Sequence, residues 1–419
     1  MSMRLTPALL QATADALSRL LEPAGPADAL LHQYFREQRQ LGQRERAFVA
    51  ETCFGVLRHL LTLRELLGKR SPRRFMLAYL ARWGGTSLRD LEPCLRGDEA
   101  QWLASLKATS HELSLAARTE LPQWLLERML PALGEEEILA LGRALQQPAP
   151  MDLRVNLLRA RREDVLARLA ADGIEARATP YSPAGVRLAD RPAINRHPLY
   201  LEGAVEVQDE GSQLLGWLTA PHRGEMVVDF CAGAGGKTLV MGALMQSLGR
   251  LYAFDVSDKR LAGLKPRLKR SGLSNVHPQR IDSENDAKVK RLAGKIDRVL
   301  VDAPCSGFGT LRRNPDFKIR QTPQSVAELS AKQAAILEGA ARLPKPGGRL
   351  VYATCSFLPE ENESVVEGFL ARHPDYRLLD CAALLAEQKI PLDTGRYLRL
   401  LPHRHGCDGF FAAALERSQ

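Results

Sequence analysis

Two cysteines in this chain of 419 residues each stand where a strand-like apolar run comes to its end. The run "DRVLVDAPCSGFG" (297–309) places Asp302 and Cys305 on either side of an alanine and a proline, and "GRLVYATCS" (348–356) ends in Cys355 and a serine. A cysteine thiolate is a strong nucleophile that can also leave again, so both thiols are candidates for covalent catalysis. The residues alone do not decide which thiol would attack a substrate and what the other would do.

A glycine-rich loop, "DFCAGAGGKT" (229–238), follows another apolar run. Its glycines would let the backbone turn tightly and approach a ligand closely. The ending "GGKT" looks like a phosphate-binding loop, but that motif needs a glycine five residues before Gly236, where Cys231 stands. The dinucleotide motif G-x-G-x-x-G is not met either, because Thr238 comes three residues after Gly235. The loop therefore favours a nucleoside ligand that lacks phosphates.

Two carboxylates further along the chain suit such a ligand, of which S-adenosylmethionine is an example. Asp255 stands about twenty residues past the loop, where an acid can accept hydrogen bonds from ribose hydroxyls. Asp282 could pair with an adenine amine, although its segment "IDSEND" would also suit a simple turn. We interpret Lys237 as a local structural or substrate-facing group, with a solvated charge as the alternative. Cys231 by itself is typical of a small buried side chain.

These residues must be positioned by short apolar runs that recur from about residue 206. The runs are "EMVVDF" (225–230), "RLYAFD" (250–255), "NVHPQRID" (275–282), "DRVLVD" (297–302) and "GRLVYAT" (348–354). Helical stretches separate most of them, and this alternation predicts an α/β domain with an open parallel sheet and helices on both faces. The reactive residues follow one strand after another, at the edge where such sheets bind ligands.

The preceding sequence predicts two further domains. Residues 1–148 repeat apolar residues at three- and four-residue spacing, which predicts an all-helical domain. After a linker at 146–152, residues 149–205 suggest a small α+β module of strand, helix and strand, similar in outline to an RNA recognition motif. The module lacks aromatic-rich strands that could stack bases, so any RNA contact there would depend on charge and shape. Residues 206–419 are then the predicted catalytic domain.

The composition indicates a globular protein with an anionic partner. Hydrophobic residues make up 45% and charged residues 26%, and no run approaches the length of a membrane span. The N-terminus lacks a signal-peptide pattern, so we expect a cytoplasmic protein, and we expect a monomer. The net charge of +9 favours nucleic acid, with a moderately basic surface as the alternative. The seven cysteines are odd in number and show no CxxC spacing, so neither a disulfide framework nor a metal site is expected.

Five stretches together resemble the motifs of a known family. They are "VQDEGSQL" (207–214), "DFCAGAGGKT" (229–238), "VDAPCSGFGTLRRNPD" (301–316), "YATCSFLPEENE" (352–363) and "HGCDGFF" (405–411). In this order they are similar to motifs of the Sun/RsmB-type RNA cytosine-5 methyltransferases, over roughly residues 149–419. The stretch "RERAFVAETCFGVLRH" looks like the NusB-like helical domain of the branch that acts on bacterial 16S ribosomal RNA. The resemblance implies a class I, Rossmann-like methyltransferase domain dependent on S-adenosylmethionine, preceded by an α+β module and a NusB-like RNA-binding domain.

The resemblance also implies roles for individual residues. Cys355 would be the nucleophile, and Cys305 would assist product release. The cofactor contacts would come from the glycine loop and three strand ends: Cys231, Ala232, Gly233, Ala234, Gly235, Gly236, Lys237, Asp255, Asp282 and Asp302. The chain departs from the family pattern at Ala234, where proline is common, and at Cys407, where threonine is usual and to which no role is assigned.

The implied chemistry explains these residue types. Carbon 5 of cytosine is a poor nucleophile until a thiolate adds to carbon 6, and Asp302 could assist by contacting the amidine side of the ring. The target base must be unstacked, and basic residues could hold the neighbouring phosphates. The candidates are the segment 259–270, for which a solvated helix face is the alternative, and Arg312, Arg313 and Lys318.

Three other functions are weighed. A DNA cytosine-5 methyltransferase would use Cys305 as the attacking thiol, but those enzymes resemble one another in a Glu-Asn-Val motif that this chain lacks. The same chemistry on another RNA, such as transfer RNA, stays open. A non-catalytic RNA-binding factor in ribosome assembly is conceivable, although the cofactor loop and both cysteines argue against it.

Overall fold

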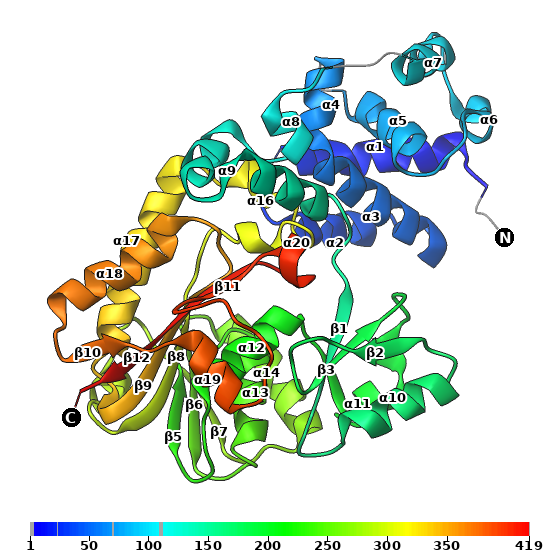
Figure 1. Ribbon diagram of the computed structural model, residues 1–419. Helices are drawn as coiled ribbons and strands as arrows, with labels where there is room; N and C mark the ends of the chain where they lie inside the picture. Colours follow the sequence, from blue (N-terminus) through cyan, green and yellow to red (C-terminus); the bar gives the residue numbers. More distant parts are fainter. Residues whose placement is uncertain (1–3, 23, 69–70, 109–111, 419) are drawn as a thin grey trace. The chain divides into compact units, whose positions relative to one another are not determined.

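The computed structural model describes residues 4–22, 24–68, 71–108 and 112–418. The chain divides into two compact units (Figure 1). One unit consists of Met1–Pro148 together with Thr310–Thr322, and the other consists of Ala149–Gly309 together with Pro323–Gln419. Among the described helices, none contains an apolar stretch long enough to cross a lipid bilayer.

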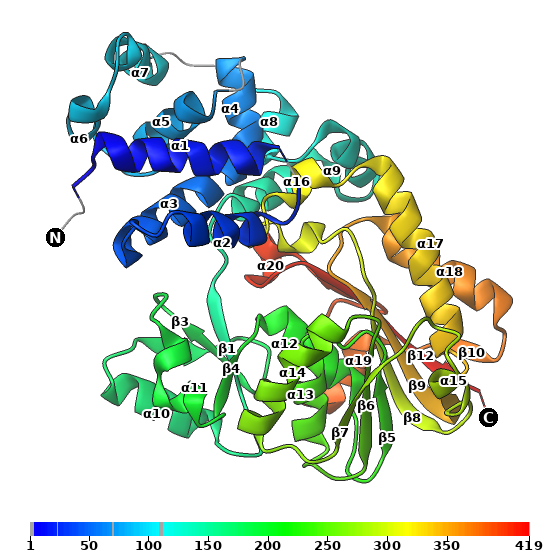
Figure 2. The same cartoon turned by 180° about the vertical axis from the view of Figure 1, so that it is seen from behind.

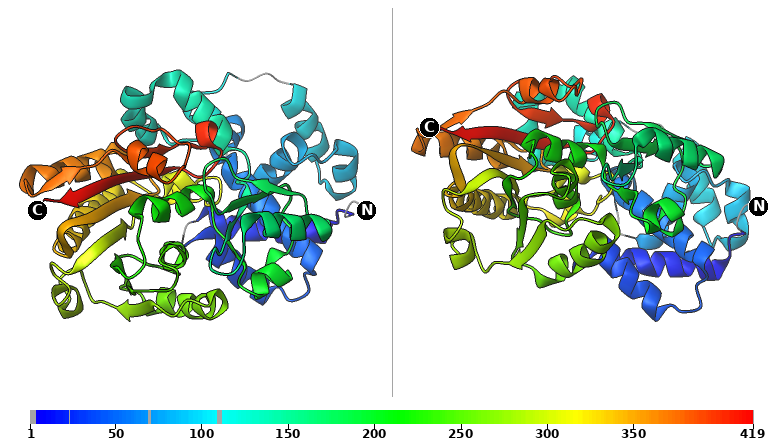
Figure 3. Two further views of the ribbon diagram at one scale, coloured as in Figure 1. Left: turned by 60° about the horizontal axis from the view of Figure 1, so that its bottom comes forward. Right: turned by 90° about the horizontal axis from the view of Figure 1, so that it is seen from below.

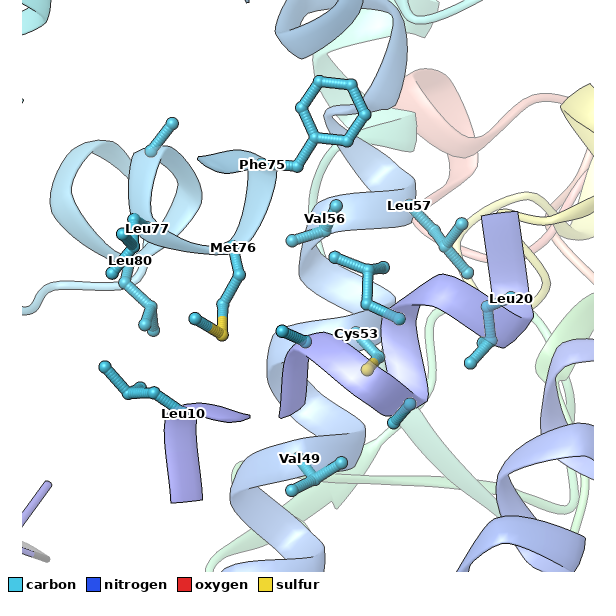
Figure 4. Packing of buried hydrophobic residues seen from close by; sticks show 14 of the residues in the cluster. Leu10, Leu20, Val49, Cys53, Val56, Leu57, Phe75, Met76, Leu77 and Leu80 are labelled. Carbon is cyan, nitrogen blue, oxygen red and sulfur yellow. The ribbon is translucent and has the colours of Figure 1, made fainter. Parts of the chain in front are cut away.

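The first unit is built from helices. Its α-helices are α1 (Pro7–Leu21), α2 (Ala27–Glu37), α3 (Gln43–Arg58), α4 (Leu60–Leu67), α5 (Pro72–Arg82), α6 (Leu88–Leu91), α7 (Glu99–Ala108), α8 (Leu115–Thr119), α9 (Gln123–Leu145) and α16 (Phe317–Arg320). Figure 4 shows side chains of α1, α3 and α5 gathered in one core. Val49, Cys53 and Val56 follow one another at four- and three-residue spacing, which places them on one face of α3. The apolar spacing of the sequence thus forms the buried faces of these helices.

The second unit begins with a small antiparallel sheet. Its strands lie in the order β2-β3-β1-β4. They are β1 (Met151–Val155), β2 (Ala176–Ala178), β3 (Gly185–Leu188) and β4 (Val205–Val207), with the helices α10 (Arg162–Ala171) and α11 (Pro198–Leu201). Leu153, Val165 and Val186 share one core. The sequence indicated strands on either side of α10 but not four of them, because β2 and β4 have only three residues each.

The larger sheet is mixed. Its parallel part has the order β9-β8-β5-β6-β7. These strands are β5 (Met226–Asp229), β6 (Arg250–Asp255), β7 (Val276–Arg280), β8 (Ile296–Asp302) and β9 (Pro344–Thr354). They coincide with the five apolar runs, so this part of the prediction is confirmed.

Three strands at one edge of this sheet were not predicted. They are β10 (Tyr376–Leu378), β11 (Leu398–Leu400) and β12 (Phe410–Arg417), all antiparallel to their neighbours. Figure 3 shows β12 in red alongside β9. The expectation of a wholly parallel sheet was therefore wrong. The segment "FFAAALER" of β12 lacks β-branched residues, and its three fully buried alanines fit a strand covered on both faces.

Helices cover both faces of the larger sheet (Figures 1 and 2). On one face lie α12 (Glu210–Thr219), α13 (Gly236–Leu244), α14 (Asp258–Ser271) and α19 (Cys381–Glu387), and on the other lie α15 (Ala287–Lys290), α17 (Pro323–Ala340) and α18 (Glu363–Arg372). A short helix, α20 (Pro402–His405), precedes β12. Side chains along β8 alternate between the two faces. Leu300 packs in the core with α12, α13 and α19, whereas Val299 and Val301 pack in the core with α15, α17 and α18.

The segment Thr310–Thr322 belongs to the helical unit, although its sequence lies inside the predicted catalytic domain. Lys318 donates hydrogen bonds to the carbonyl of Arg58 (2.8 Å) and to the carboxylate of Glu120 (2.9 Å). The Lys318 and Glu120 side chains are almost fully buried, and Ile319 packs against the helical core. The range predicted for the catalytic domain is therefore interrupted, because a buried ion pair and an apolar contact join this segment to the N-terminal helices.

Candidate active site

Cys305 and Cys355 lie next to each other. The strands that precede them, β8 and β9, are parallel neighbours, with Asp302 paired to Ala353 in the register. The two Sγ atoms are 3.2 Å apart, and the backbone N–H of Cys355 donates to Cys305 Sγ at 3.3 Å. Both thiols are partly exposed. Two cysteines fifty positions apart in the sequence thus form one pair at the carboxyl edge of the sheet.

Two glycines let the backbone close around this pair. The N–H of Gly309 donates to the carbonyl of Cys355, and the N–H of Gly409 donates to the carbonyl of Gly309, both at 2.8 Å. A Cβ atom on Gly309 would lie 2.1 Å from the Gly409 carbonyl oxygen, and one on Gly409 would lie 2.2 Å from Phe357. No side chain fits at either position. The motif "HGCDGFF" therefore supports the loop that carries Cys355.

The glycine loop connects β5 to α13 and is fixed from the neighbouring strand. The N–H of Gly233 donates to Asp255 Oδ2 at 2.9 Å. Gly233 has a φ of 56°, and a Cβ atom there would meet no atom within 4 Å, so open space lies in front of the loop. Gly235 has a φ of 82°, and a Cβ atom there would lie 2.0 Å from Leu264. Glycine at Gly235 thus serves helix packing, while Gly233 faces the open space.

Asp229 is a buried carboxylate at the end of β5. One oxygen accepts a hydrogen bond from the Thr238 hydroxyl at 2.6 Å, and the other is buried without a hydrogen-bond partner. Burial raises the pKa of Asp229 to about 7, and the charges of Asp302 and Asp255 act in the same direction. The sequence analysis placed this residue at the strand end but gave it no role.

Lys237 joins the glycine loop to the thiol loops. Its ammonium forms an ion pair with Asp302 at 2.6 Å and lies 5.7 Å from the centre of the Phe410 ring. Burial acts to lower the pKa of Lys237, but the negative charges of Asp302, Asp229 and Cys355 outweigh it, and the pKa is raised. Lys237 therefore stays protonated among these groups.

The residues around the loop fit S-adenosylmethionine. The charges of Asp255 and Asp302 both act on Asp229, while Lys237 pairs with Asp302 and Arg260 lies 3.9 Å from Asp255. The three acids outnumber these two cations, which suits a cationic sulfonium. Nothing blocks a ligand from approaching the backbone at Gly233, and the buried Asp229 oxygen offers an unused acceptor.

Asp282 is placed differently from the other predicted cofactor residues. Its side chain is 78% exposed and forms an ion pair with Arg280 at 3.1 Å. Its backbone N–H donates to Asp286 at 2.9 Å, as in the turn that was the alternative interpretation. Cys231, in contrast, lies within the loop, and burial raises the pKa of its thiol. Asp282 follows β7, the strand at the far edge of the sheet.

Several basic residues predicted to contact phosphates are buried or already paired. Arg312 is only 6% exposed, and Lys318 is held by Glu120 inside the helical unit. For Arg312 and Lys318 the prediction was wrong, because buried side chains cannot reach a phosphate, whereas Arg313 is half-buried and its contact with RNA stays a prediction. In the 259–270 segment, Arg267 and Arg270 both pair with Glu206.

Four other basic side chains of this segment are exposed on α14: Lys259, Arg260, Lys265 and Lys269. In the described part of the chain, no group of three or more His, Cys, Asp or Glu side chains is arranged to hold a metal ion.

Family models match most of the second unit. A model described as 16S rRNA methyltransferase RsmB/F matches residues 217–416. A second, described as the Methyltr_RsmF/B-like, ferredoxin-like domain, matches residues 121–195.

Curated proteins show the same similarity along the chain. The probable ribosomal RNA small subunit methyltransferase B of Synechocystis sp. is 37% identical over 308 residues, which cover 73% of this chain and 69% of that protein. The ribosomal RNA small subunit methyltransferase B of Pectobacterium carotovorum subsp. carotovorum is 31% identical and covers 97% of both chains.

Solved structures share the fold. The crystal structure of PH0851 has a TM-score of 0.78 and 27% identity, and the match covers all of both chains. A methyltransferase homolog protein from Pyrococcus horikoshii has a TM-score of 0.62 and 30% identity, over 72% of this chain and 97% of that one.

Proposed function

This chain belongs to the RsmB/F family of 16S rRNA methyltransferases, and we propose that Cys355 attacks the target cytosine while Cys305 completes product release. The enzyme is an RNA cytosine-5 methyltransferase dependent on S-adenosylmethionine. The observation that carries the proposal is the thiol pair, whose sulfurs are 3.2 Å apart at neighbouring strand ends.

The reaction begins at Cys355. Its thiolate forms a bond to carbon 6 of cytosine, which makes carbon 5 enamine-like and nucleophilic. Asp302 contacts the amidine side of the ring, and Lys237 holds Asp302 in place through the ion pair. The bound cofactor supplies the methyl group that carbon 5 takes up.

Product release depends on Cys305. After methylation, carbon 5 carries both a methyl group and a hydrogen. The Cys305 thiolate takes this hydrogen as a proton, and the C–H electrons re-form the double bond between carbons 5 and 6. The Cys355 sulfur then leaves with the electron pair of its bond to carbon 6.

The ionisation of Cys305 changes during this sequence. Its pKa is raised by the hydrogen bond with Cys355, by burial, and by the charges of Cys355 and Glu361. While Cys355 is a free thiolate, Cys305 therefore keeps its proton. Once the Cys355 sulfur is bound to carbon 6, its charge is gone and the pKa of Cys305 falls. Cys305, which is partly exposed, then gives its proton to solvent before it takes the proton from carbon 5.

The cofactor is held by the loop Cys231–Lys237 and by the acids at the strand ends. Asp255 would accept from the ribose hydroxyls, and Asp282 would pair with the adenine amine if it turned away from Arg280. Support for this set comes from the open space at Gly233 and from the negative charge around it.

The RsmB/F family supports 16S rRNA as the substrate. We propose 16S rRNA in the cytoplasm as the target, bound by a monomer. The NusB-like helical domain (1–148), the module 149–205 and the exposed basic side chains of α14 would contact the RNA, and the base would be unstacked to reach the thiols.

Bisulfite sequencing of RNA from cells with and without the gene tests this function. We expect one cytosine of 16S rRNA to lose its 5-methyl mark without the gene. Loss of a mark in transfer RNA instead would move the same chemistry to another substrate, and loss of no mark would favour a non-catalytic assembly factor.

A further inference from the structure

A buried carboxylate, Glu361, contacts residues next to both thiols. It ends the short 3₁₀ turn Pro359–Glu361, and its side chain is fully buried. Its oxygen Oε1 accepts hydrogen bonds from the N–H of Ser306 (2.8 Å) and the amide of Gln333 (3.0 Å). Its oxygen Oε2 accepts from the hydroxyls of Ser306 and Ser356. A buried carboxylate requires such partners, and here all four are donors.

The partners are the chain neighbours of the thiols. Ser306 follows Cys305, and Ser356 follows Cys355. The two serine hydroxyls also lie 3.1 Å from each other. A single side chain therefore joins both cysteine loops.

The carboxylate is itself braced by rigid elements. The hydroxyl of Tyr352, on β9, donates to the Glu361 carbonyl at 2.6 Å. Gln333, on α17, donates to the carbonyl of Pro304 at 2.9 Å as well as to Glu361. The link between the two loops thus rests on a strand and a long helix, which suits a group that must fix a geometry.

We propose that Glu361 is a positioning residue that sets the distance and direction between the Cys305 and Cys355 thiols. The inference rests on the proposed function and deepens it. Cys305 can take the proton from carbon 5 only if its sulfur stays aligned while Cys355 is bound to carbon 6. A neutral amide would weaken this network, because its NH₂ group can only donate and both hydroxyls would have to turn and accept from it.

Steady-state kinetics of Glu361→Gln test the proposal. We expect kcat to fall about a hundredfold, the loss that a misplacement of about 1 Å can cause, with KM for RNA and the Kd for S-adenosylmethionine within about twofold of wild type. Glu367 is an exposed carboxylate on α18, so Glu367→Gln is the matched control and should change none of these three constants. If Glu361→Gln does not fold, Ser356→Ala is the second variant, because it removes one hydroxyl that donates to Glu361 and leaves the carboxylate in place.

A second readout needs no RNA. Iodoacetamide labels thiolates, and mass spectrometry reports the labelling of each cysteine as a function of pH. Since the Glu361 charge contributes to the raised pKa of Cys305, we expect Cys305 in Glu361→Gln to react at a lower pH than in wild type. Either an unchanged kcat or an unchanged Cys305 profile would overturn the proposal. A wild-type enzyme that methylates no RNA would instead refute the proposed function, and the labelling would still decide the role of Glu361.

Discussion

Asp255 holds the glycine loop and the following turn together. One carboxylate oxygen accepts from the N–H of Gly233 at 2.9 Å, and the other accepts from the N–H of Ser257 at 2.8 Å. Each oxygen has a further lone pair for a ribose hydroxyl. The same side chain can therefore shape the loop and contact the ligand.

Replacing Asp255 with alanine should weaken the binding of S-adenosylmethionine by about 1–3 kcal/mol, because two backbone donors and the ribose hydroxyls lose their acceptor. Isothermal titration calorimetry measures this directly. Asp282→Ala is the comparison, and we expect a smaller loss because that side chain is exposed and pairs with Arg280. An unchanged affinity in Asp255→Ala would contradict the assignment.

Asp229 makes the stability of the apo protein depend on pH. Its pKa is raised to about 7 from the ordinary 3.8, so the folded state binds the proton more tightly than the unfolded chain does. The stability that this group contributes is complete below about pH 4 and is lost as the pH rises through about 7. Asp229→Asn removes the titration, so its Tm minus that of wild type should increase from pH 5 to pH 8. A difference that stays constant would show that Asp229 is ionised at both pH values.

The sequence identified the types of the site residues better than their contacts. Cys305, Cys355 and the glycine loop are marked by chemistry and spacing that few other structures require. Glu361 stood inside a quoted motif without a role, because its importance depends on burial behind two loops that are far apart in the sequence. Arg312 was misjudged for the same reason, since a basic residue gives no local sign that it will be buried.

The segment Thr310–Thr322 packs with the helical unit, although the residues before and after it in the sequence belong to the other unit. Lys318, on α16, donates to the carbonyl of Arg58, the last residue of α3, and Glu120 accepts from two N–H groups in the first turn of α4. The ion pair between them thus joins three elements of the helical unit. The five parallel strands could be predicted from their apolar runs. The place of Thr310–Thr322 in the helical unit could not, because it depends on one buried ion pair between residues far apart in the sequence.

Lys318→Met should destabilise the helical unit by about 3–5 kcal/mol, because it leaves the buried carboxylate of Glu120 without its charge partner. Methionine keeps most of the apolar stem, so the change isolates the charge. Arg118→Ala removes an exposed pair with Glu135 and should cost no more than about 1 kcal/mol. Urea unfolding followed by circular dichroism compares the two variants, and equal losses would refute a special role for the buried pair.

Only some of the basic residues behind the net charge of +9 are free of acidic partners and exposed to a nucleic acid. Arg267, Arg270 and Lys318 are neutralised by acidic partners, whereas Lys259 and Lys265 are among the exposed side chains of α14. The sequence could give the sum of the charges and the sign of the partner. It could not show which cations remain available, because pairing is decided by the fold.

Changing Lys259, Lys265 and Lys269 together to glutamine should weaken RNA binding and reduce the slope of log affinity against log salt by about 2, since each contact to single-stranded RNA contributes about 0.7. Fluorescence anisotropy with a 16S rRNA fragment at several salt concentrations measures the slope. The same change at the exposed Lys288, Lys290 and Lys295 is the matched control. Equal slopes in the two triple variants would show that the basic side chains of α14 face solvent and do not contact the RNA.

The central claim is that Cys355 attacks the cytosine and Cys305 releases the product. A denaturing gel of Cys305→Ala and Cys355→Ala with labelled 16S rRNA and S-adenosylmethionine tests it most directly. Cys305→Ala can attack and methylate but not release, so we expect a denaturation-resistant protein–RNA adduct that requires the cofactor. Cys355→Ala should form no adduct and no 5-methylcytosine. An adduct in Cys355→Ala but not in Cys305→Ala would reverse the roles, and a Cys305→Ala enzyme that is fully active without an adduct would leave Cys305 without a part in release.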